Sequence, residues 1–537
     1  MALLKRKKPR DPIPPSVEPP PRELSPLRVL ILIVAIAALV FGAWKLLDRE
    51  TAATAAKSDA VPVYSPYVDV TLTPTYPFQL PSANPVSSVY LAFIVSDSSE
   101  PCRPSWSDYY TLDQAVQGLD LDARTAQLRD QGGSVMVSFG GRDNGELAVG
   151  CTSPAKLRAA YLAPVTRYHA SAIDLDLEGE TLSDRAANAR RAKAIAAVQK
   201  QVTGKDRPLA IWVTLPVSAA GLTGEGEAAV RSLLDAGVKL AGVNAMAMDF
   251  GTEEAAEDVL GTVESSLTAT HSQVQSLWRD AGLEAGAAAA WGHVGATVMI
   301  GVNDITEERF TTRDARGLAA FVNKVGIPRV SIWSLNRDSQ CGGAFARTGV
   351  LSNTCSGVVQ KPLEFTQIFG QLRGTKTALH EAAGSRVPAA AADAKRDDPA
   401  KSPYPIWRAS AAYVAGYKVV WQGQIYEASW WNQGTPPGSA AADSPTGPWQ
   451  PIGPVPADSH AAKLVMLVEG DLPRWSPTAV YHQGDQVEFD DFPYRARWYT
   501  KGEQPIANLP ADPSAPWEPL FKYPGEPSTA EPIEAEP

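Results

Sequence analysis

Three acidic side chains alternate with aliphatic ones in the stretch SAIDLDLEGE, which spans residues 171–180. Because side chains on a strand alternate faces with period two, Asp174, Asp176 and Glu178 share one face. Carboxyl groups held this close raise one another's pKa. They titrate as a group and keep a proton within the set. The stretch therefore predicts a general acid, and a solvated strand face or a cation site is the structural alternative.

The acids need a scaffold that brings several strand ends together. Between residues 81 and 373, short β-rich runs alternate with Ala-rich helical stretches, which predicts an α/β fold of the (β/α)8 TIM barrel type. The absence of a Gly-rich phosphate fingerprint after the first run disfavours a doubly wound sheet. Seven strands are expected at 89–95, 133–141, 171–178, 209–216, 241–251, 295–304 and 329–338, with an eighth near Tyr109–Asp113.

The C-terminal ends of barrel strands carry the chemistry, so we expect Glu178 at the mouth and the two Asp residues progressively deeper. Small residues in SFGG let the backbone approach an occupied site. A Trp at the last strand end can stack on a sugar ring or pack in the core. The candidates for substrate contact at the other strand ends are Ser138, Gly140, Gly141, Asn244, Met246, Met248, Asp249 and Trp333.

These motifs together resemble glycoside hydrolase family 18, the chitinases, over residues 85–370. The family's fourth-strand signature DxxDxDxE reads here as Ser171, Asp174, Asp176 and Glu178, with Ser in place of the first Asp. The third-strand SxGG motif and the eighth-strand Trp are both matched, by Ser138–Gly141 and Trp333. The sixth-strand MxYD motif is matched at Met246 and Asp249, but Met248 stands in place of its Tyr.

The resemblance implies retaining, substrate-assisted hydrolysis of β-1,4 linkages in N-acetylglucosamine polymers. Glu178 would protonate the glycosidic oxygen while the substrate's own acetamido oxygen attacks the anomeric carbon. Asp176 would orient the acetamide and stabilise the developing charge, and Trp333 would floor the sugar. A Met cannot replace the hydroxyl of the family's Tyr, so Asn244 or Asp249 is the candidate substitute. Two alternatives stay open: a chitin-binding surface protein with impaired catalysis, and an endo-β-N-acetylglucosaminidase acting on other glycans.

An internal repeat with a single offset of 68 residues occupies residues 403–521. The repeated residues of the first copy are Trp407, Tyr413, Gly416, Val419, Tyr426, Ala428, Trp430, Trp431, Gly434, Pro437 and Trp449. Their partners are Trp475, Tyr481, Gly484, Val487, Tyr494, Ala496, Trp498, Tyr499, Gly502, Pro505 and Trp517. The copies predict two small all-β modules, at 403–453 and 471–521.

The two modules are similar to chitin-binding modules of the carbohydrate-binding family 5/12 type. Flat aromatic rings on a small sheet can stack on the apolar faces of a polysaccharide, and two modules on one chain gain avidity. Packing inside the modules is the alternative use of these rings. The candidate binding residues are Trp407, Trp430, Trp431, Trp475, Trp498 and Tyr499.

The N-terminal part of the chain predicts a membrane anchor. A basic, Pro-rich leader at 1–27 precedes a transmembrane helix at 28–48, whose uncharged run from Val29 to Trp44 approaches the ~20 residues of a span. Positive charge before the helix predicts a single-pass protein with its catalytic region outside the cytoplasm. A cleaved signal peptide and secretion form the alternative. We expect a tether at 49–80, linkers at 374–402 and 454–470, and a disordered tail at 522–537.

Charge and cysteine content narrow the expected partners. A net charge of −10 argues against a nucleic-acid binder. Four cysteines suit an oxidising compartment. Cys341 and Cys355 bracket a short Gly-rich loop and are a candidate pair, which would leave Cys102 and Cys151 as the second. Without a CxxC motif, and with six scattered histidines, neither a metal nor another cofactor is expected. The expected partners are chitin or chitooligosaccharides and the membrane, with the chain as a monomer.

Overall fold

The structure is a computed structural model of the chain, which forms two units, residues 1–52 and 53–537. It describes residues 35–36, 57, 60–143, 145–202, 209–284, 286–342, 349–375, 397–409, 411–438, 446–463, 465–468, 472–489, 492–505, 515–522 and 524. Apart from residues 35–36, the predicted anchor at 28–48 lies outside this part, as do the leader at 1–27 and most of the predicted tail. None of the described helices combines the length and the apolar character that crossing a bilayer requires.

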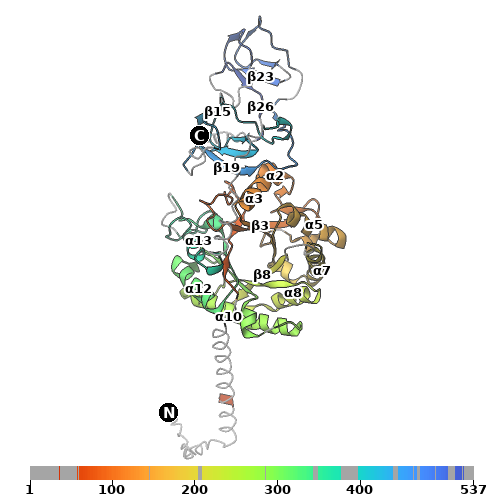
Figure 1. Ribbon diagram of the computed structural model, residues 1–537, viewed down its shortest axis with the longest axis vertical. Helices are drawn as coiled ribbons and strands as arrows, with labels where there is room; N and C mark the ends of the chain where they lie inside the picture. Colours follow the sequence, from red (N-terminus) through yellow and green to blue (C-terminus); the bar gives the residue numbers. More distant parts are fainter. Residues whose placement is uncertain are drawn as a thin grey trace, which may run out of the picture. The chain divides into compact units, whose positions relative to one another are not determined.

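A closed ring of eight parallel strands forms the centre of the larger unit, and Figure 1 shows helices arranged around it. The pair β1 and β2 serves as one strand, and it closes the ring by pairing with the last strand and with the next one. The predicted barrel is thus confirmed. Its strands are β1 (Val63–Tyr64) with β2 (Tyr67–Asp69), β3 (Ser88–Ser96), β6 (Ser134–Gly140), β7 (Ala172–Asp176), β8 (Ala210–Ser218), β10 (Leu240–Met246), β11 (Val294–Met299) and β14 (Arg329–Trp333).

Helices follow most of the strands and cover the outside of the barrel. The longest have clear start signals, such as Thr223, Asp258 and Thr311 at the N-caps of α8, α10 and α12. The helices are α2 (Gln114–Gly118), α3 (Leu121–Asp130), α4 (Leu147–Gly150), α5 (Pro154–Arg167), α6 (Gly179–Ser183), α7 (Arg185–Val202), α8 (Gly224–Asp235), α9 (Glu253–Glu257), α10 (Val259–Asp280), α11 (Ala287–Trp291), α12 (Thr312–Val325) and α13 (Glu364–Phe369).

The eighth barrel strand lies at 63–69, so the strand near Tyr109–Asp113 is present but its assignment to the barrel is wrong. Residues 63–69 belong to the segment predicted as a tether, and the barrel begins there rather than at 81. Ser65 and Pro66 divide the strand into pieces of two and three residues, and Pro66 has no N–H to donate to a ladder. Residues Tyr110–Thr111 form β5, which pairs antiparallel with β4 (Pro104–Trp106) in a hairpin beside β3.

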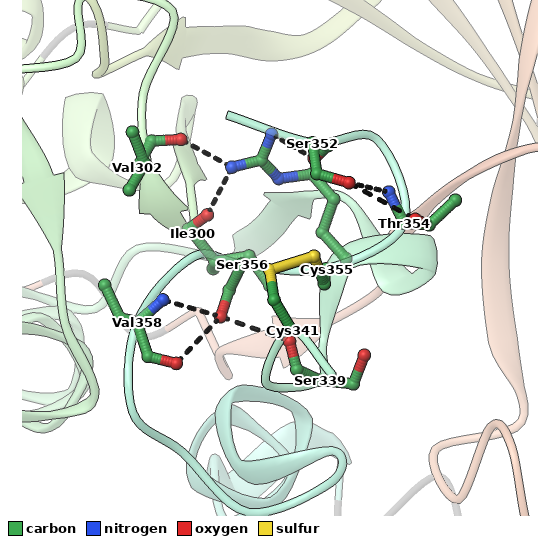
Figure 2. Close-up of a disulfide and its surroundings, with 10 residues drawn as sticks. Ile300, Val302, Ser339, Cys341, Ser352, Thr354, Cys355, Ser356 and Val358 are labelled. Carbon is green, nitrogen blue, oxygen red and sulfur yellow. Dashed lines mark hydrogen bonds between the residues drawn. A yellow bond between two sulfur atoms is a disulfide. The ribbon is translucent and has the colours of Figure 1, made fainter. Parts of the chain in front are cut away.

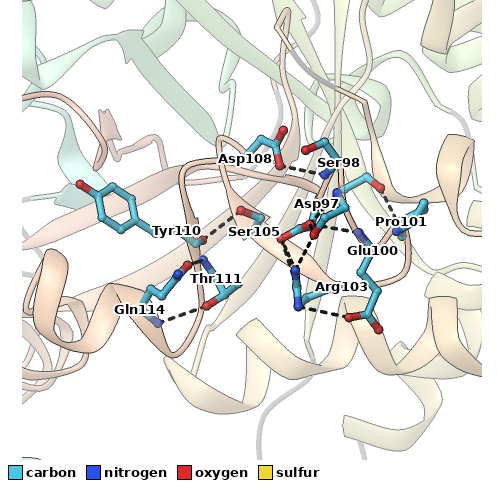
Figure 3. A network of polar contacts seen from close by, with 12 residues as sticks. Asp97, Ser98, Glu100, Pro101, Arg103, Ser105, Asp108, Tyr110, Thr111 and Gln114 are labelled. Carbon is cyan, nitrogen blue, oxygen red and sulfur yellow. Dashed lines mark hydrogen bonds and ion pairs between the residues drawn. The ribbon is translucent and has the colours of Figure 1, made fainter.

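A network of polar contacts holds the connection into the β4–β5 hairpin (Figure 3). Asp97 accepts hydrogen bonds from the backbone of Ser99 and Glu100, and its second oxygen forms an ion pair with Arg103 at 2.9 Å. Asp108 at the hairpin tip accepts from the Ser98 N–H at 2.8 Å. The disulfide between Cys102 and Cys151 fastens the same segment to the end of α4. The hairpin is therefore a braced rim of the barrel.

The second disulfide joins Cys341 and Cys355 beyond the end of β14, so the cysteines pair as expected. Beside it, the buried Arg337 donates hydrogen bonds to the carbonyl oxygens of Ile300, Val302 and Ser352, as Figure 2 shows. Burial lowers the pKa of the Arg337 guanidinium to about 10. These contacts tie the loop after β14 to β12 (Gly301–Val302), which pairs with β13 (Arg309–Phe310). The remaining short strand, β9 (Gly221–Leu222), pairs with β8.

The C-terminal repeat forms two small β-modules with matching cores, around Trp449 in module 1 and Trp517 in module 2. Each has a three-stranded antiparallel sheet and a two-stranded one. The strands of module 1 are β15 (Ala412–Tyr413), β16 (Lys418–Trp421), β17 (Gln424–Ala428), β18 (Asn432–Gln433) and β19 (Trp449–Pro454). Those of module 2 are β20 (Val465–Met466), β21 (Val480–Tyr481), β22 (Gln486–Phe489), β23 (Phe492–Ala496), β24 (Thr500–Lys501), β25 (Trp517–Pro519) and β26 (Phe521–Lys522).

Candidate active site

Every residue of β7 is buried, and its two faces have opposite character. Ile173 and Leu175 belong to the main hydrophobic core, whereas Asp174 and Asp176 on the other face point into the barrel. The period-two reading of SAIDLDLEGE is therefore confirmed for this strand. Glu178 follows two residues after its end and is half-buried.

Asp174 is completely buried and fully hydrogen-bonded. One carboxylate oxygen accepts from the hydroxyls of Tyr67 and Ser138, both at 2.7 Å. The other accepts from the Thr214 hydroxyl at 2.6 Å and from the Arg329 guanidinium at 2.8 Å. Charge-assisted bonds of this kind stabilise an ionised carboxylate. Asp174 is thus held by four donors at the base of the site.

The next two acids lack such compensation. Burial first, and then the charges of Glu178 and Asp174, raise the pKa of Asp176 well above its usual range. One Asp176 oxygen, Oδ1, is buried without a hydrogen-bond partner among the described residues. Burial also raises the pKa of Glu178 to about 7, although Arg142 nearby works in the opposite direction. A carboxyl group protonated near neutral pH is what a general acid requires.

A cavity of about 730 Å³ opens above these acids. Trp333 lines it and stacks on Phe93, with ring centroids 5.3 Å apart and planes 19° apart. This arrangement gives the cavity a flat aromatic wall of a size that fits a pyranose ring. The predicted residues among its lining are Asp176, Glu178, Met246, Met248, Asp249 and Trp333.

Ser138, Gly140 and Gly141 lie outside the cavity lining and hold the strand beside the acids, and their contact with substrate stays a prediction. Gly140 has φ of 104°, and a Cβ there would lie 2.0 Å from the carbonyl oxygen of Asp176. The Gly141 N–H donates to that same oxygen at 3.0 Å. The glycines therefore let the end of β6 bind the backbone beside the acids.

Met248 lacks the hydroxyl group of the family's Tyr, and the structure distinguishes between the two candidate substitutes. Asn244, a predicted substitute for the family's Tyr, lies outside the cavity lining and donates hydrogen bonds to Thr214 and Thr297. Asp249, the other candidate, does line the cavity, and burial raises its pKa. One of its oxygens accepts from the Ile305 N–H at 2.9 Å. Asp249 is therefore the better placed of the two.

Three residues that donate hydrogen bonds to Asp174 are absent from the sequence predictions, namely Tyr67, Thr214 and Arg329. Arg329, at the start of β14, is buried and lies 4.0 Å above the Tyr90 ring. Its second nitrogen donates to the Tyr67 hydroxyl at 2.6 Å. The signal for Arg329 was a lone basic residue opening the strand RVSIW, and Tyr67 lies in the segment predicted as a tether.

The mouth of the cavity carries further charge. Arg142 after β6 forms an ion pair with Asp304 from the loop after β12. Asp143 and Asp249 line the same region. The three carboxylates raise the pKa of Glu178 and Arg142 lowers it. The balance of these charges therefore sets the proton affinity of the candidate acid.

The predicted binding residues of the modules divide into two groups. Trp430, Trp431, Trp498 and Tyr499 are exposed by 42–61%. All four follow a strand end rather than lie within the strand. Trp407 and Trp475 are half-buried and pack against the module cores. The exposed pairs are thus the available stacking surface.

Similarity to known proteins comes from pairwise comparisons, since no protein-family model matches the chain. Over 302 residues, 54% of this chain, it is 34% identical to a protein of Escherichia coli strain K12 named probable bifunctional chitinase/lysozyme, and it covers 32% of that protein. Over 302 residues, again 54%, it is 32% identical to Endochitinase 11 of Metarhizium anisopliae and covers 55% of it.

The catalytic domain of a hyperthermophilic chitinase from Pyrococcus furiosus is 25% identical, with a TM-score of 0.49, and the match covers 61% of this chain and 98% of that domain. The chain spans about a third and about half the length of its two curated relatives. Over about half of its own length, the chain that carries this site is a sequence relative of a bacterial chitinase/lysozyme and a fungal endochitinase.

Proposed function

We propose that the barrel is a glycoside hydrolase of the chitinase type, which cleaves β-1,4 linkages of N-acetylglucosamine polymers with retention. The observation that carries the proposal is the graded set of acids on one strand face. Asp174 is compensated by four donors, while Asp176 and Glu178 have raised pKa values beneath an aromatic-walled cavity. The curated relatives, both named as chitinases, support the same reading.

In the first step, protonated Glu178 gives its proton to the glycosidic oxygen as the bond to the anomeric carbon breaks. The acetamido oxygen of the same sugar attacks that carbon, which forms an oxazolinium ion and leaves Glu178 ionised. Asp176 accepts a hydrogen bond from the acetamide N–H through its unpartnered oxygen and stabilises the positive charge that develops on the oxazolinium ring. Trp333 supports the sugar from below.

In the second step, ionised Glu178 removes a proton from a water molecule that attacks the anomeric carbon. The oxazolinium ring opens, the acetamide is restored, and Glu178 is protonated again. Two inversions at the same carbon leave the product with the configuration of the substrate. A single carboxyl group near pKa 7 can serve in both directions at neutral pH.

The direct test is hydrolysis of chitohexaose and colloidal chitin by the purified full chain in mild detergent, beside Glu178→Gln. We expect sugar release by the wild type alone, with the β-anomer appearing first in NMR spectra. A thiazoline analogue of the oxazolinium should inhibit, since stable mimics of reactive intermediates bind tightly. If the wild type binds chitin but releases no sugar, the protein is a chitin-binding surface protein rather than an enzyme. If both proteins release sugar equally, Glu178 is not the general acid.

The substrate itself needs a separate comparison. The name of the bacterial relative includes lysozyme, so peptidoglycan is a second arm of the assay. N-glycans form a third arm, for endo-β-N-acetylglucosaminidase action. We expect chitin to be preferred because two aromatic-bearing modules suit an extended polymer. Faster release from peptidoglycan or N-glycans would reassign the substrate while the roles of the acids stand.

A further inference from the structure

Module 1 is seated on the barrel through one face of its three-stranded sheet. Side chains of this sheet alternate, and one face builds the module's own core around Trp449. The other face packs with Ala123 of α3 in a separate apolar cluster. We call this second face the docking face; its apolar members are Tyr404, Val420, Ile425 and Ile452.

The fit is close at the backbone. Gly453, in β19, approaches α3 so closely that a Cβ at this position would lie 2.0 Å from the carbonyl oxygen of Ala123. No side chain fits there without a shift of one backbone against the other. The close contact between the two backbones therefore requires a glycine at position 453.

A buried carboxylate completes the contact. Asp120 is the N-cap of α3, yet its side chain makes no capping hydrogen bond. An Asp at this position ordinarily accepts from the first turn of the helix. Here one oxygen accepts from the Tyr404 hydroxyl and the other forms an ion pair with Lys418. Only 1% of Asp120 is exposed with module 1 in place, so this carboxyl group is buried in the contact between the barrel and module 1.

The second repeat copy provides an internal comparison. Its core residues match those of the first copy, including Trp449 and Trp517. Its equivalent of the docking face does not match, because the positions of Tyr404, Lys418, Val420, Ile425 and Gly453 are taken in module 2 by Leu472, Gln486, Glu488, Pro493 and Phe521.

That face of module 2 carries partly exposed charged pairs, although Ile452 is matched there by the buried Leu520. Glu488 is 32% exposed beside Arg474, and Arg495 forms an ion pair with Glu518 at 2.6 Å, with 45% and 32% of these two side chains exposed. Because the two copies share a core but differ across this face, we expect the face to have a different role in each module.

We infer that the two modules have different tasks, module 1 being a fixed part of the catalytic body and module 2 an independent tether. Module 1 holds Trp430 and Trp431 in a constant position relative to the cavity, so that polymer bound there is presented to the barrel in one geometry. Module 2 adds affinity through Trp498 and Tyr499 without setting that geometry. The assignment of these tasks rests on the proposed action on a chitin-like polymer.

The chain offers a matched pair of variants. Tyr404→Leu/Lys418→Gln/Val420→Glu places module 2's own residues on the docking face of module 1, so the module core is unchanged. The control, Ala415→Gln, also transfers a module 2 residue, Gln483, at an exposed position in the turn between β15 and β16. Both variants are compared with the wild type as full chains.

Calorimetry tests directly whether module 1 is docked on the barrel. We expect module 1 and the barrel to unfold in one transition in the wild type and in the control. In the triple variant a separate transition for module 1 should appear at lower temperature, and a fluorophore pair placed on α3 and on module 1 should report a widened distance distribution. A triple variant that unfolds like the wild type would overturn the docking role.

Measurements of hydrolysis rates test whether the two modules have different tasks. We expect the triple variant to lose several-fold in the rate on colloidal chitin at saturation while its rate on chitohexaose stays at the wild-type level. Trp430→Ala/Trp431→Ala should lower the saturated rate on the polymer, whereas Trp498→Ala/Tyr499→Ala should lower only the bound fraction. Equal effects of the two pairs in the wild-type background would overturn the inference.

The outcomes separate this inference from the proposed function. If the wild type releases no sugar from chitohexaose, the proposed function fails, and with it the assigned tasks, while the calorimetric result still decides the docking. If hydrolysis is present and the triple variant retains its full rate on colloidal chitin, the proposed function stands and the inference fails.

Discussion

Asp174, Asp176 and Glu178 share one strand face and differ in what surrounds them. Four donors compensate Asp174, burial and then two neighbouring acids raise the pKa of Asp176, and burial near the cavity mouth raises that of Glu178 to about 7. At this scale the sequence predicts the acids well, because period two alone places them together. It does not predict Arg329 or Tyr67, whose contacts with Asp174 join residues 155 and 107 positions apart.

Removing the carboxyl group of Glu178 is the sharpest change at the residue scale. Glu178→Gln should lower kcat on chitohexaose by about 10²–10⁴-fold, the usual contribution of a general acid. Glu180→Gln, two residues on and exposed, is the matched control and should keep the wild-type rate. A Glu178→Gln variant within tenfold of the wild type would argue against its role as the acid.

The pH dependence follows from the sign of the Glu178 shift. Its pKa is raised to about 7, so the donor is protonated below that pH and loses its proton above it. We expect kcat/KM to fall as the pH rises through about 7. A profile that is flat from pH 5 to 9 would contradict the assignment.

The ion pair at the cavity mouth allows a test of opposite signs. Arg142 lowers the pKa of Glu178 and Asp304 raises it. Arg142→Gln should therefore move the alkaline limb of the kcat/KM profile to higher pH, and Asp304→Asn should move it to lower pH. If the pair acted only by holding two loops together, both variants would change the rate in the same direction without opposite shifts of the limb.

Arg329 carries the stability of the buried cluster. Arg329→Met leaves Asp174 as an uncompensated buried charge, so we expect the free energy of unfolding to fall by about 3–5 kcal/mol. Arg329→Lys keeps the charge but loses the second hydrogen bond, to Tyr67, and should cost less. Urea denaturation of the full chain measures both. Equal stability of the Met variant and the wild type would show that the hydroxyl groups of Tyr67, Ser138 and Thr214 satisfy Asp174 without Arg329.

At the scale of elements, seven barrel strands follow from the sequence and the eighth does not. Their alternation with helices is a local signal, and strands of five to nine residues rich in aliphatic side chains mark them. The closing strand has no such run, since β1 and β2 are two and three residues long and flank Ser65 and Pro66. Its identity depends on pairing with β14 and β3, which no local pattern encodes.

The two disulfides close loops of different length, which ranks their contributions. Cys102 and Cys151 are 49 residues apart, and Cys341 and Cys355 are 14 apart. Chain entropy predicts about 4 kcal/mol for the longer loop and about 3 kcal/mol for the shorter one. We expect Cys102→Ser/Cys151→Ser to lower the denaturation midpoint more than Cys341→Ser/Cys355→Ser. The reverse order would show that local contacts, such as those of Arg337, outweigh loop length.

At the scale of the whole molecule, the sequence predicts the modules and misses how differently they are used. A single offset of 68 residues identifies the copies, because core positions recur. The docking of module 1 depends on Asp120, whose short-range pattern is that of an ordinary helix N-cap. Its contacts with Tyr404 and Lys418, 284 and 298 residues away, distinguish it.

The exposed aromatic pairs lead to a prediction about binding. Removing either pair by Ala substitution should weaken retention on colloidal chitin, and removing both should weaken it by more than the product of the single effects, since avidity is then lost. Pull-down of the full chain at a series of chitin concentrations measures this. Retention that is unchanged without both pairs would show that the rings serve only the module surface.

The position of the closing strand in the sequence also determines how long the barrel stays open during synthesis. The Tyr64 N–H is bonded to the Thr375 hydroxyl, 311 residues later, and β1 pairs with β14 across the same seam. At about 5–20 residues per second, the ribosome needs roughly 15–60 s between making one partner and the other. Until then the first and last strands of the growing barrel have open edges that can pair with other chains. A nascent chain of this protein therefore depends on protection of its unpaired strands for most of its synthesis.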